Sequence, residues 1–336
     1  MNSFERVMGS LKGQAVDRTP NFDIVMGFGM RFIGEPLQGY FLDYRTLVKA
    51  HLAVAETFAI DVVSIIADSY RECADLGAEV IFPEDGLPYP VRPLFAGIDD
   101  FKNYRLPDPL IGRRMGDAVE GCRLFKEKVG GQIPVMGWVE GALAQANILV
   151  GDQALLYSLY DRPAWVHDLL EICTQVEIEF ARAQIAAGAD IIGLGDAIAS
   201  LVSPAMYREC ALPYEQRIFQ AVHNLGAIAR LHICGNTNHI LPDMLESGAD
   251  IIDLDWMVDI RKAAEVFGDR AAVCGNFDPV AVMLQGTEEE VERAVSYCLE
   301  NGGQRYFSAA GCEIPEGTPH ENLRAQAQVL GRDTLS

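Results

Sequence analysis

Short apolar segments alternate with amphipathic segments along almost the whole chain, and this alternation is the strongest constraint on its fold. The apolar segments have the length and the aliphatic content of buried strands. Eight of them lie at 21–26, 60–66, 133–138, 190–194, 227–234, 250–254, 270–274 and 306–309. Segments with apolar residues at helical spacing lie at 3–12, 44–59, 153–187 (interrupted at 161–163), 204–225, 237–247, 259–267, 288–301 and 319–330.

Alternation of strands and helices indicates a parallel sheet, because a parallel connection needs a crossover, usually a helix. Eight such units predict an α/β fold in which residues 1–336 form one domain, a single (β/α)8 TIM barrel. The alternative is a doubly wound open sheet. That fold would require a glycine-rich phosphate loop after the first strand, and Phe28-Gly29-Met30-Arg31 is not one.

The regular alternation is interrupted between residues 72 and 131. Segments 78–82 and 89–91 flank a Pro-Glu-Asp-Gly-Leu-Pro stretch and predict a surface hairpin, and 112–129 predicts a helix. The interruption holds too few apolar residues for a core of its own. We therefore expect an elaborated loop after the second strand and not a second domain.

The composition of the 336-residue chain indicates a soluble cytoplasmic protein. Hydrophobic residues make up 49%, enough for a barrel-sized core. A formal net charge of −21 repels nucleic acid phosphates and anionic lipid, so we expect neither as a partner. No segment reaches transmembrane length, and the first residues lack the apolar core of a signal peptide. Without an export signal, the eight scattered cysteines indicate free thiols or metal ligands.

Barrel enzymes build their active sites at the carboxyl ends of the strands, where this chain carries several reactive side chains. His232 and Cys234 lie two residues apart on one strand, so both side chains point to the same face. The other strand ends supply Asp68, Glu140, Asp196, Asp255, Cys274 and Cys312.

A lone His-x-Cys pair is more often packed in a core, since a free cysteine behaves as a small hydrophobe. Here, however, three different strands bring His232, Cys234, Cys274 and Cys312 to one predicted rim. Imidazole nitrogen and thiolate sulfur are the ligands that zinc prefers. These four residues therefore predict a zinc site. The remaining cysteines fall in or beside predicted helices and are expected to be structural: Cys73, Cys122, Cys173, Cys210 and Cys298.

Two acids at the rim are candidate catalytic residues. Glu140 lies next to a glycine, where it could reach a substrate, fix a metal-bound histidine or simply cap a helix. Asp255 is the best candidate for an oxygen ligand, because a labile carboxylate can leave when substrate arrives. Asp255 and Cys274 compete for the fourth position on zinc, and we favour Cys274 because zinc is borderline-soft.

Four motifs together resemble the uroporphyrinogen decarboxylase superfamily: Asp-Arg-Thr-Pro at 17–20, Leu-His-Ile-Cys-Gly-Asn at 231–236, Gly-Asn-Phe-Asp-Pro at 275–279 and Ala-Gly-Cys-Glu-Ile-Pro at 310–315. Within it the chain is most similar to zinc methyltransferases that work with corrinoid proteins, such as the methylcobamide:coenzyme M methyltransferases. The resemblance implies a single (β/α)8 barrel with zinc on His232, Cys234 and Cys312. It also implies that an acid at the place of Asp255 can complete the zinc shell, and that a partner protein carries the corrinoid.

Two departures from the superfamily bear on the activity. The decarboxylases carry an arginine-rich motif after the first strand and have no thiolates at the places of Cys234 and Cys312, whereas this chain has only Arg31 in that loop. These differences argue against porphyrinogen decarboxylation without a metal, which we keep only as the alternative activity. Cys274 is a difference from the coenzyme M enzymes, which are not expected to have a cysteine at that place.

The resulting prediction is a zinc-dependent methyltransferase that moves a methyl group between a small methylated ether, amine or thiol and the cobalt of a corrinoid protein. Zinc would lower the pKa of a thiol or act as a Lewis acid on a methylated substrate. A non-catalytic zinc barrel or an unrelated metal hydrolase is a third possibility. The methyl donor and acceptor, the direction of transfer, the fourth zinc ligand and the oligomeric state stay open at this point.

The loop after the first predicted strand is unusually aromatic. Loops after barrel strands overhang the active site, so these rings predict an apolar lid over the zinc. The alternative is that they pack the loop against the barrel. The rings belong to Phe28, Phe32, Tyr40, Phe41 and Tyr44.

Overall fold

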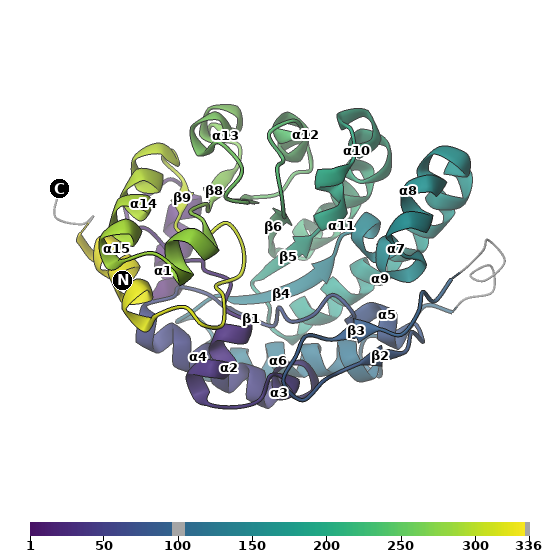
Figure 1. Ribbon diagram of the computed structural model, residues 1–336, viewed down its shortest axis with the longest axis horizontal. Helices are drawn as coiled ribbons and strands as arrows, with labels where there is room; N and C mark the ends of the chain where they lie inside the picture. The colour runs from purple at the N-terminus through teal and green to yellow at the C-terminus, as the bar shows by residue number, and fades with distance from the viewer. Residues whose placement is uncertain (96–104, 333–336) are drawn as a thin grey trace.

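The computed structural model describes residues 1–95 and 105–332. Within these residues the central feature is a curled sheet of seven parallel strands in the order β1-β4-β5-β6-β7-β8-β9. The strands lie inside and the helices surround them (Figure 1). The strand bounds are β1 Val63–Ser64, β4 Val135–Glu140, β5 Ile191–Gly195, β6 Ile228–Ile233, β7 Ile251–Leu254, β8 Ala272–Cys274 and β9 Tyr306–Phe307. The predicted parallel α/β architecture is confirmed.

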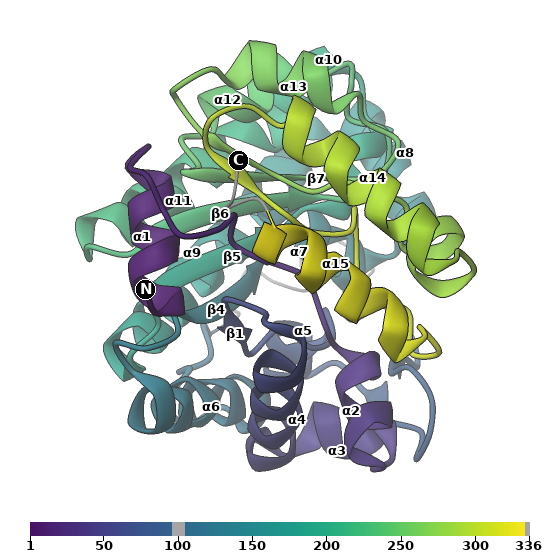
Figure 2. The same cartoon turned by 90° about the vertical axis from the view of Figure 1, so that its left-hand side faces the viewer.

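The helices follow the expected segments closely. Their bounds are α1 Ser3–Leu11, α4 Tyr44–Phe58, α6 Arg113–Val129, α8 Asp152–Asp161, α9 Pro163–Ala187, α10 Pro204–Cys210, α11 Leu212–Asn224, α12 Leu241–Glu246, α13 Ile260–Phe267, α14 Glu288–Asn301 and α15 His320–Arg332. Thr287 and Glu290 form a capping box that fixes the start of α14. The single helix expected over 204–225 is two helices, because Pro213 cannot donate the backbone hydrogen bond that would continue α10. Helix α15 lies beside α14 (Figure 2).

The first predicted strand, 21–26, is not a strand. Asn21 forms one isolated parallel bridge with Ser308. The backbone NH of Phe22 donates to the Ser308 carbonyl at 2.8 Å, and that of Asp61 donates to the Asn21 carbonyl at 2.8 Å. The ladder ends there because the next donor, Ala310 NH, bonds the side chain of Asp23 at 2.8 Å. Seven strands and one bridge therefore stand where eight strands were expected, and a complete eight-stranded barrel is not confirmed.

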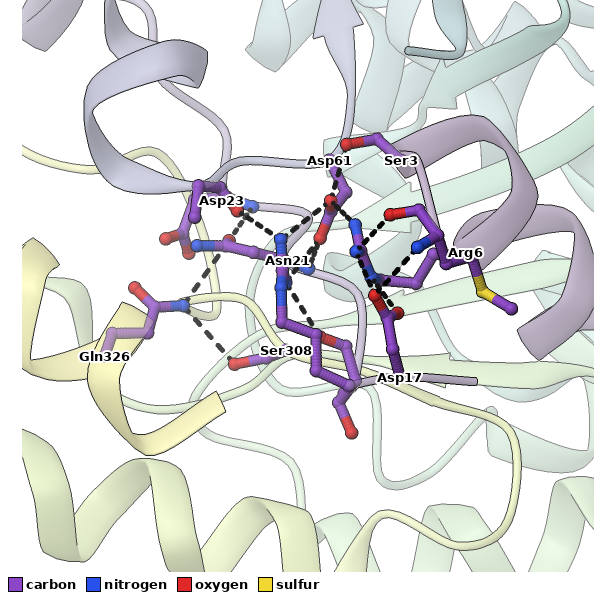
Figure 3. A network of polar contacts seen from close by, with 12 residues as sticks. Ser3, Arg6, Asp17, Asn21, Asp23, Asp61, Ser308 and Gln326 are labelled. Atoms are coloured by element: carbon purple, nitrogen blue, oxygen red, sulfur yellow. Dashed lines mark hydrogen bonds and ion pairs between the residues drawn. The ribbon is translucent and has the colours of Figure 1, made fainter. Parts of the chain in front are cut away.

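Next to this bridge, the carboxylate of Asp61 holds α1 and the segment 18–21 together (Figure 3). Its Oδ1 accepts hydrogen bonds from Ser3 Oγ and Arg6 Nη1, both at 2.7 Å. Its Oδ2 accepts from Arg18 Nη1 at 2.7 Å and from the backbone NH of Asn21 at 2.8 Å. Asp61 is fully buried, so these donors replace the water that its charge has lost.

The interruption after β1 contains the predicted surface hairpin, with β2 Val80–Ile81 antiparallel to β3 Tyr89–Pro90, followed by α6. Before the hairpin lies the short helix α5 Arg71–Asp75. Residues 96–104 of the elaborated loop lie outside the described residues.

Two segments outside the predicted helices are helical. The aromatic loop forms α2 Gly27–Ile33 and α3 Leu37–Leu42, because its apolar side chains can be buried together against α4. Gly34 ends α2 in the left-handed conformation, with φ 73°. The segment after β4 forms α7 Ala142–Val150, in which apolar residues occur on every face and leave no helical period to detect.

Within residues 1–95 and 105–332, no helix combines the length and the apolar character needed to cross a membrane.

We expect Asp61→Asn to destabilise the protein by about 3 kcal/mol, because it removes the shared counter-ion of the buried Arg6 and the partly buried Arg18. Urea unfolding followed by circular dichroism would measure this change. Asp17→Asn is the matched control: Asp17 also pairs with Arg6, but its side chain is 40% exposed, and the loss should stay below about 1 kcal/mol. Equal losses in the two variants would contradict the assignment of Asp61 as the central group.

Candidate active site

Three of the four predicted soft ligands meet at the carboxyl end of the sheet. His232 is the second-last residue of β6, Cys234 follows the strand directly, and Cys312 lies in the loop after β9. His232 Nε2 is 3.0 Å from Cys234 Sγ and 3.9 Å from Cys312 Sγ, and the two sulfurs are 3.8 Å apart. One imidazole nitrogen and two sulfurs within 4.8 Å of one another are a donor set that suits zinc and leaves a position open for substrate.

The orientation of His232 is set by Asp253 on the neighbouring strand. The two residues are partners in the parallel register of β6 and β7, and His232 Nδ1 lies 3.0 Å from Asp253 Oδ2. Arg230 Nη2 contacts the same oxygen at 2.5 Å. With Nδ1 turned toward a carboxylate, Nε2 is the nitrogen that faces the thiols, as in metal sites where a carboxylate orients the histidine ligand.

The charges in this group stabilise one another. Burial lowers the pKa of His232, but the neighbouring Cys234 and Asp253 raise it more, and the net shift is well upward. The hydrogen bond from Cys234 lowers the pKa of Cys312 to about 4, with His232 adding to the effect. The same pairing raises the pKa of Cys234. The pair therefore shares one proton and holds one thiolate beside the imidazole, ready to bind a soft cation.

A cavity of about 170 Å³ opens beside these three residues. At about 30 Å³ per water molecule it holds roughly six non-hydrogen atoms. Larger hollows of about 870 Å³ and 620 Å³ exist elsewhere, but none of the three ligands lines either one. The small cavity is lined by Ile24, Met26, Ile66, Ala67, Ser69, Trp138, Glu140, Gly195, Ala197, His232, Cys234, Cys312 and Glu313.

Trp138 forms one wall of the cavity because β5 leaves room for its ring. A Cβ atom at Gly193 would lie 2.3 Å from Trp138 Cε3, and one at Gly195 would lie 3.0 Å from Cζ2. The indole Nε1 donates to Glu140 Oε1 at 3.3 Å, and the ring centroid is 6.5 Å from that of His232. The two glycines therefore place an aromatic face next to His232.

Two carboxyl groups line the cavity, and both have raised pKa values. Burial, followed by repulsion from Glu72, raises the pKa of Glu140 well above its ordinary value. Burial also raises the pKa of Glu313 to about 7, although its Oε1 accepts a hydrogen bond from Gly27 NH at 2.9 Å. Both groups therefore bind a proton more tightly than a solvent-exposed glutamate does.

The structure does not bring Cys274 or Asp255 into the group. Cys274 is fully buried at the end of β8, 3.8 Å from Arg230 Nη2, where it faces Arg230 and Asp253 and not the two thiols. Both carboxylate oxygens of Asp255 already accept hydrogen bonds from loop backbone, one from Gly235 NH at 2.9 Å and the other from Met257 NH at 3.1 Å. Neither residue lines the cavity.

The remaining acids at the strand ends also have structural partners. Asp68 forms a buried ion pair with Arg114, and Asp196 accepts from the backbone NH of Ala144 at 2.9 Å. The aromatic lid is not formed: Phe28 and Phe32 pack against Phe58 and His320, and none of the five predicted rings lines the cavity. The five cysteines expected to be structural are all buried in the helices α5, α6, α9, α10 and α14.

Sequence reasoning missed four residues of the site: Arg230, Asp253, Trp138 and Glu313. A signal existed for the first two. Arg230 is two residues before His232 and therefore shares its face, and an acid within the apolar segment 250–254 needs a buried partner. For Trp138 the signal was the pair of glycines two residues apart on the next strand.

Comparison with known proteins gives relatives of two kinds. A family model described as uroporphyrinogen decarboxylase (URO-D) matches residues 2–331. The chain is 35% identical over 233 residues to "Methylcobamide:CoM methyltransferase MtbA" of Methanosarcina mazei, covering 69% of this chain and 66% of that protein, slightly less than two thirds. It is 28% identical over 328 residues to a "Uroporphyrinogen decarboxylase" of Xanthomonas campestris pv. campestris, covering 90% of each. A solved structure described as "methyltransferase from Methanosarcina mazei" has a TM-score of 0.89 at 26% identity, and 98% of each chain is covered.

We expect the purified protein to bind about one zinc per chain, because one imidazole and two thiols converge on a single point. Elemental analysis after dialysis measures the stoichiometry. The double variant Cys234→Ala, Cys312→Ala should lose the metal, whereas Cys274→Ala should keep it. Full zinc content in the double variant, or its loss in Cys274→Ala, would contradict the ligand assignment.

We expect Asp253→Asn to weaken zinc binding by roughly 10- to 100-fold, because His232 loses the charge that orients it. Competition with a chromophoric chelator measures the affinity. Asp250→Asn, on the exposed start of the same strand region, should leave the affinity unchanged. An unchanged affinity in Asp253→Asn would mean that backbone packing alone positions the imidazole.

Proposed function

The chain belongs to the uroporphyrinogen decarboxylase (URO-D) family, and on that premise we propose that it transfers a methyl group between a small substrate and the cobalt of a corrinoid carried by a partner protein. The observation that carries the proposal is the group of His232, Cys234 and Cys312 beside a small cavity. The names of the Methanosarcina relatives support the same reaction class. The methyl donor or acceptor would be a methylated ether, amine or thiol.

The proposal includes zinc as the metal, held by His232, Cys234 and Cys312. When bound, zinc would supply a Lewis acid that lowers the pKa of a thiol substrate or polarises the heteroatom of a methylated one. Asp253 would hold the imidazole in its binding orientation. Cys274 and Asp255 are not part of this ligand set; Asp255 would act on the site only by fixing the backbone of Gly235, next to Cys234.

The transfer changes the bonding at one carbon. In the thiol-methylating direction, the substrate sulfur gains the methyl carbon and loses its proton, and the electron pair of the broken carbon–cobalt bond stays on cobalt. The reverse direction requires a proton for the leaving oxygen, nitrogen or sulfur. We assign the handling of this proton to Glu140, which lines the cavity and binds a proton more tightly than an exposed glutamate because burial raises its pKa.

The apolar walls of the cavity would limit the access of water to the reacting atoms and so would protect a reduced cobalt. Ile24, Met26 and Ile66 form its apolar side, and Trp138 faces the histidine. The corrinoid would have to approach from the carboxyl ends of the strands, where the cavity lies.

Porphyrinogen decarboxylation, the activity in the names of other relatives, is less well supported. The chain has only Arg31 in the loop where the decarboxylases carry an arginine-rich motif, and Arg31 is already paired with Asp85 and Glu316.

We also propose that the chain forms a complete eight-stranded barrel. The segment around Asn21 occupies the place of the first strand between β9 and β1, and one domain would span the chain. The match of 98% of the chain to the Methanosarcina structure supports this arrangement.

We expect zinc-loaded protein to demethylate methylcobalamin in the presence of a suitable thiol, or to methylate cob(I)alamin from a suitable methylated compound. The visible spectrum of the corrinoid follows both reactions. Cys312→Ala should abolish the reaction, Glu140→Gln should lower kcat by about 10²-fold or more, and Cys274→Ala should remain active. If no member of a panel of ethers, amines and thiols reacts in either direction, the proposed activity is wrong.

A further inference from the structure

Two glycines beside the thiols allow neighbouring loops to pack directly against the candidate metal-binding group. Gly235 directly follows the first of the two cysteines, and Gly311 directly precedes the second. A Cβ atom at Gly235 would lie 2.9 Å from Ser200 Oγ, in the loop after β5. One at Gly311 would lie 2.2 Å from the backbone nitrogen of Trp256, in the loop after β7. The loops after β5 and β7 therefore lie in contact with the loops that carry the thiols.

These two neighbouring loops expose three large apolar side chains. Leu201, next to Ser200, is 69% exposed, Trp256 is 49% exposed and Met257 is 40% exposed. Single apolar side chains are common on protein surfaces, whereas a group of them beside a site marks a surface that binds something. We call Leu201, Trp256 and Met257 the apolar rim.

Asp255 fixes the apolar rim relative to the thiols. One of its carboxylate oxygens accepts from Gly235 NH at 2.9 Å, and the other accepts from Met257 NH at 3.1 Å. Trp256, between Asp255 and Met257 in sequence, also lines the hollow of about 620 Å³. The rim is thus held next to the cysteine loop on one side and continues into a groove on the other.

A corrin ring is far larger than the cavity beside the thiols. The cavity of about 170 Å³ has room for roughly six non-hydrogen atoms, which is enough for a methyl group on a small substrate but not for a macrocycle. If the methyl group is to reach the cavity, the ring must lie outside it, across the residues that surround the thiols. Aromatic and aliphatic side chains are the groups that pack against the largely apolar face of such a ring.

We infer that the apolar rim is the surface on which the corrin ring rests during the transfer. The inference rests on the proposed methyl transfer, and it assigns part of the corrinoid binding to side chains of this chain. Trp256 would contribute most, because its half-exposed indole is the largest apolar group of the three and tryptophan is enriched among residues that dominate binding.

Equilibrium dialysis against free methylcobalamin, with no thiol present, measures what the rim contributes. The visible absorbance of the corrinoid gives the bound fraction. We expect Trp256→Ala to raise the Kd at least about tenfold while keeping the circular dichroism spectrum of the parent protein. Leu225→Ala is the matched control. Leu225 is 45% exposed but lies between α11 and β6, at the amino end of the sheet, so the Kd should not change.

Oxidation by hydroxyl radicals, mapped by mass spectrometry, tests the same surface in the unaltered chain. Bound hydroxocobalamin should slow the oxidation of Trp256 and Met257 several-fold, because the ring would cover both side chains. Met1 is the internal control: it is 56% exposed, and the residue after it bonds the Gly131 carbonyl just before β4, at the other end of the sheet. Its oxidation corrects for radicals that the corrinoid consumes.

These measurements separate the inference from the proposed activity. If the corrinoid binds and covers the rim but no methyl group moves in either direction, the proposed activity is wrong and the inference stands. If methyl transfer occurs and Trp256→Ala keeps the parent Kd, the activity stands and the inference is overturned. The inference is also overturned if the parent protein binds no corrinoid, or if the corrinoid leaves the oxidation of the rim unchanged.

Discussion

The geometry of the candidate site depends on one buried carboxylate, that of Asp253. It lies between the guanidinium of Arg230 and the imidazole of His232, and all three are almost completely buried. A lone charge in that position would cost several kcal/mol, so each member of the trio is tolerated only because the others are present. The parallel register of β6 and β7 sets the spacing, since His232 and Asp253 are partners in it.

The curl of the sheet brings residues of the candidate site that are distant in sequence to one point. Cys234 and Cys312 are 78 residues apart in sequence but 3.8 Å apart in space. Because all strands run the same way, the loops that follow β6 and β9 open on the same end of the sheet. Glu140 reaches the same end from β4, and Trp138 reaches it because Gly193 and Gly195 carry no side chains.

Much of this could be predicted from the sequence, and the failures have physical reasons. The proximity of His232, Cys234 and Cys312 could be predicted, because all three lie at or after the carboxyl ends of strands. In a parallel sheet these ends lie at the same end of the sheet. Cys274 was misplaced because a strand end does not reveal which neighbour its side chain faces, and here that neighbour is the Arg230–Asp253 pair. The aromatic residues after the first predicted strand were expected over the cavity, but Phe28 and Phe32 pack against Phe58 and His320. The bridge at Asn21 was expected as a strand, because the sequence does not show that Asp23 takes the next backbone donor.

The Asp61 network has a consequence for how the protein is made. Ser3, Arg6, Arg18 and Asn21 all precede Asp61, so this part of the fold can form early during synthesis on the ribosome. Ser308, which bridges to Asn21, and Cys312, the third member of the proposed metal-binding group, emerge much later. In the proposed zinc site, His232 and Cys234 would therefore be available to metal ions before the third ligand has been synthesised. Tight binding would have to wait for Cys312, so metal capture would follow the folding of the Asp61 network.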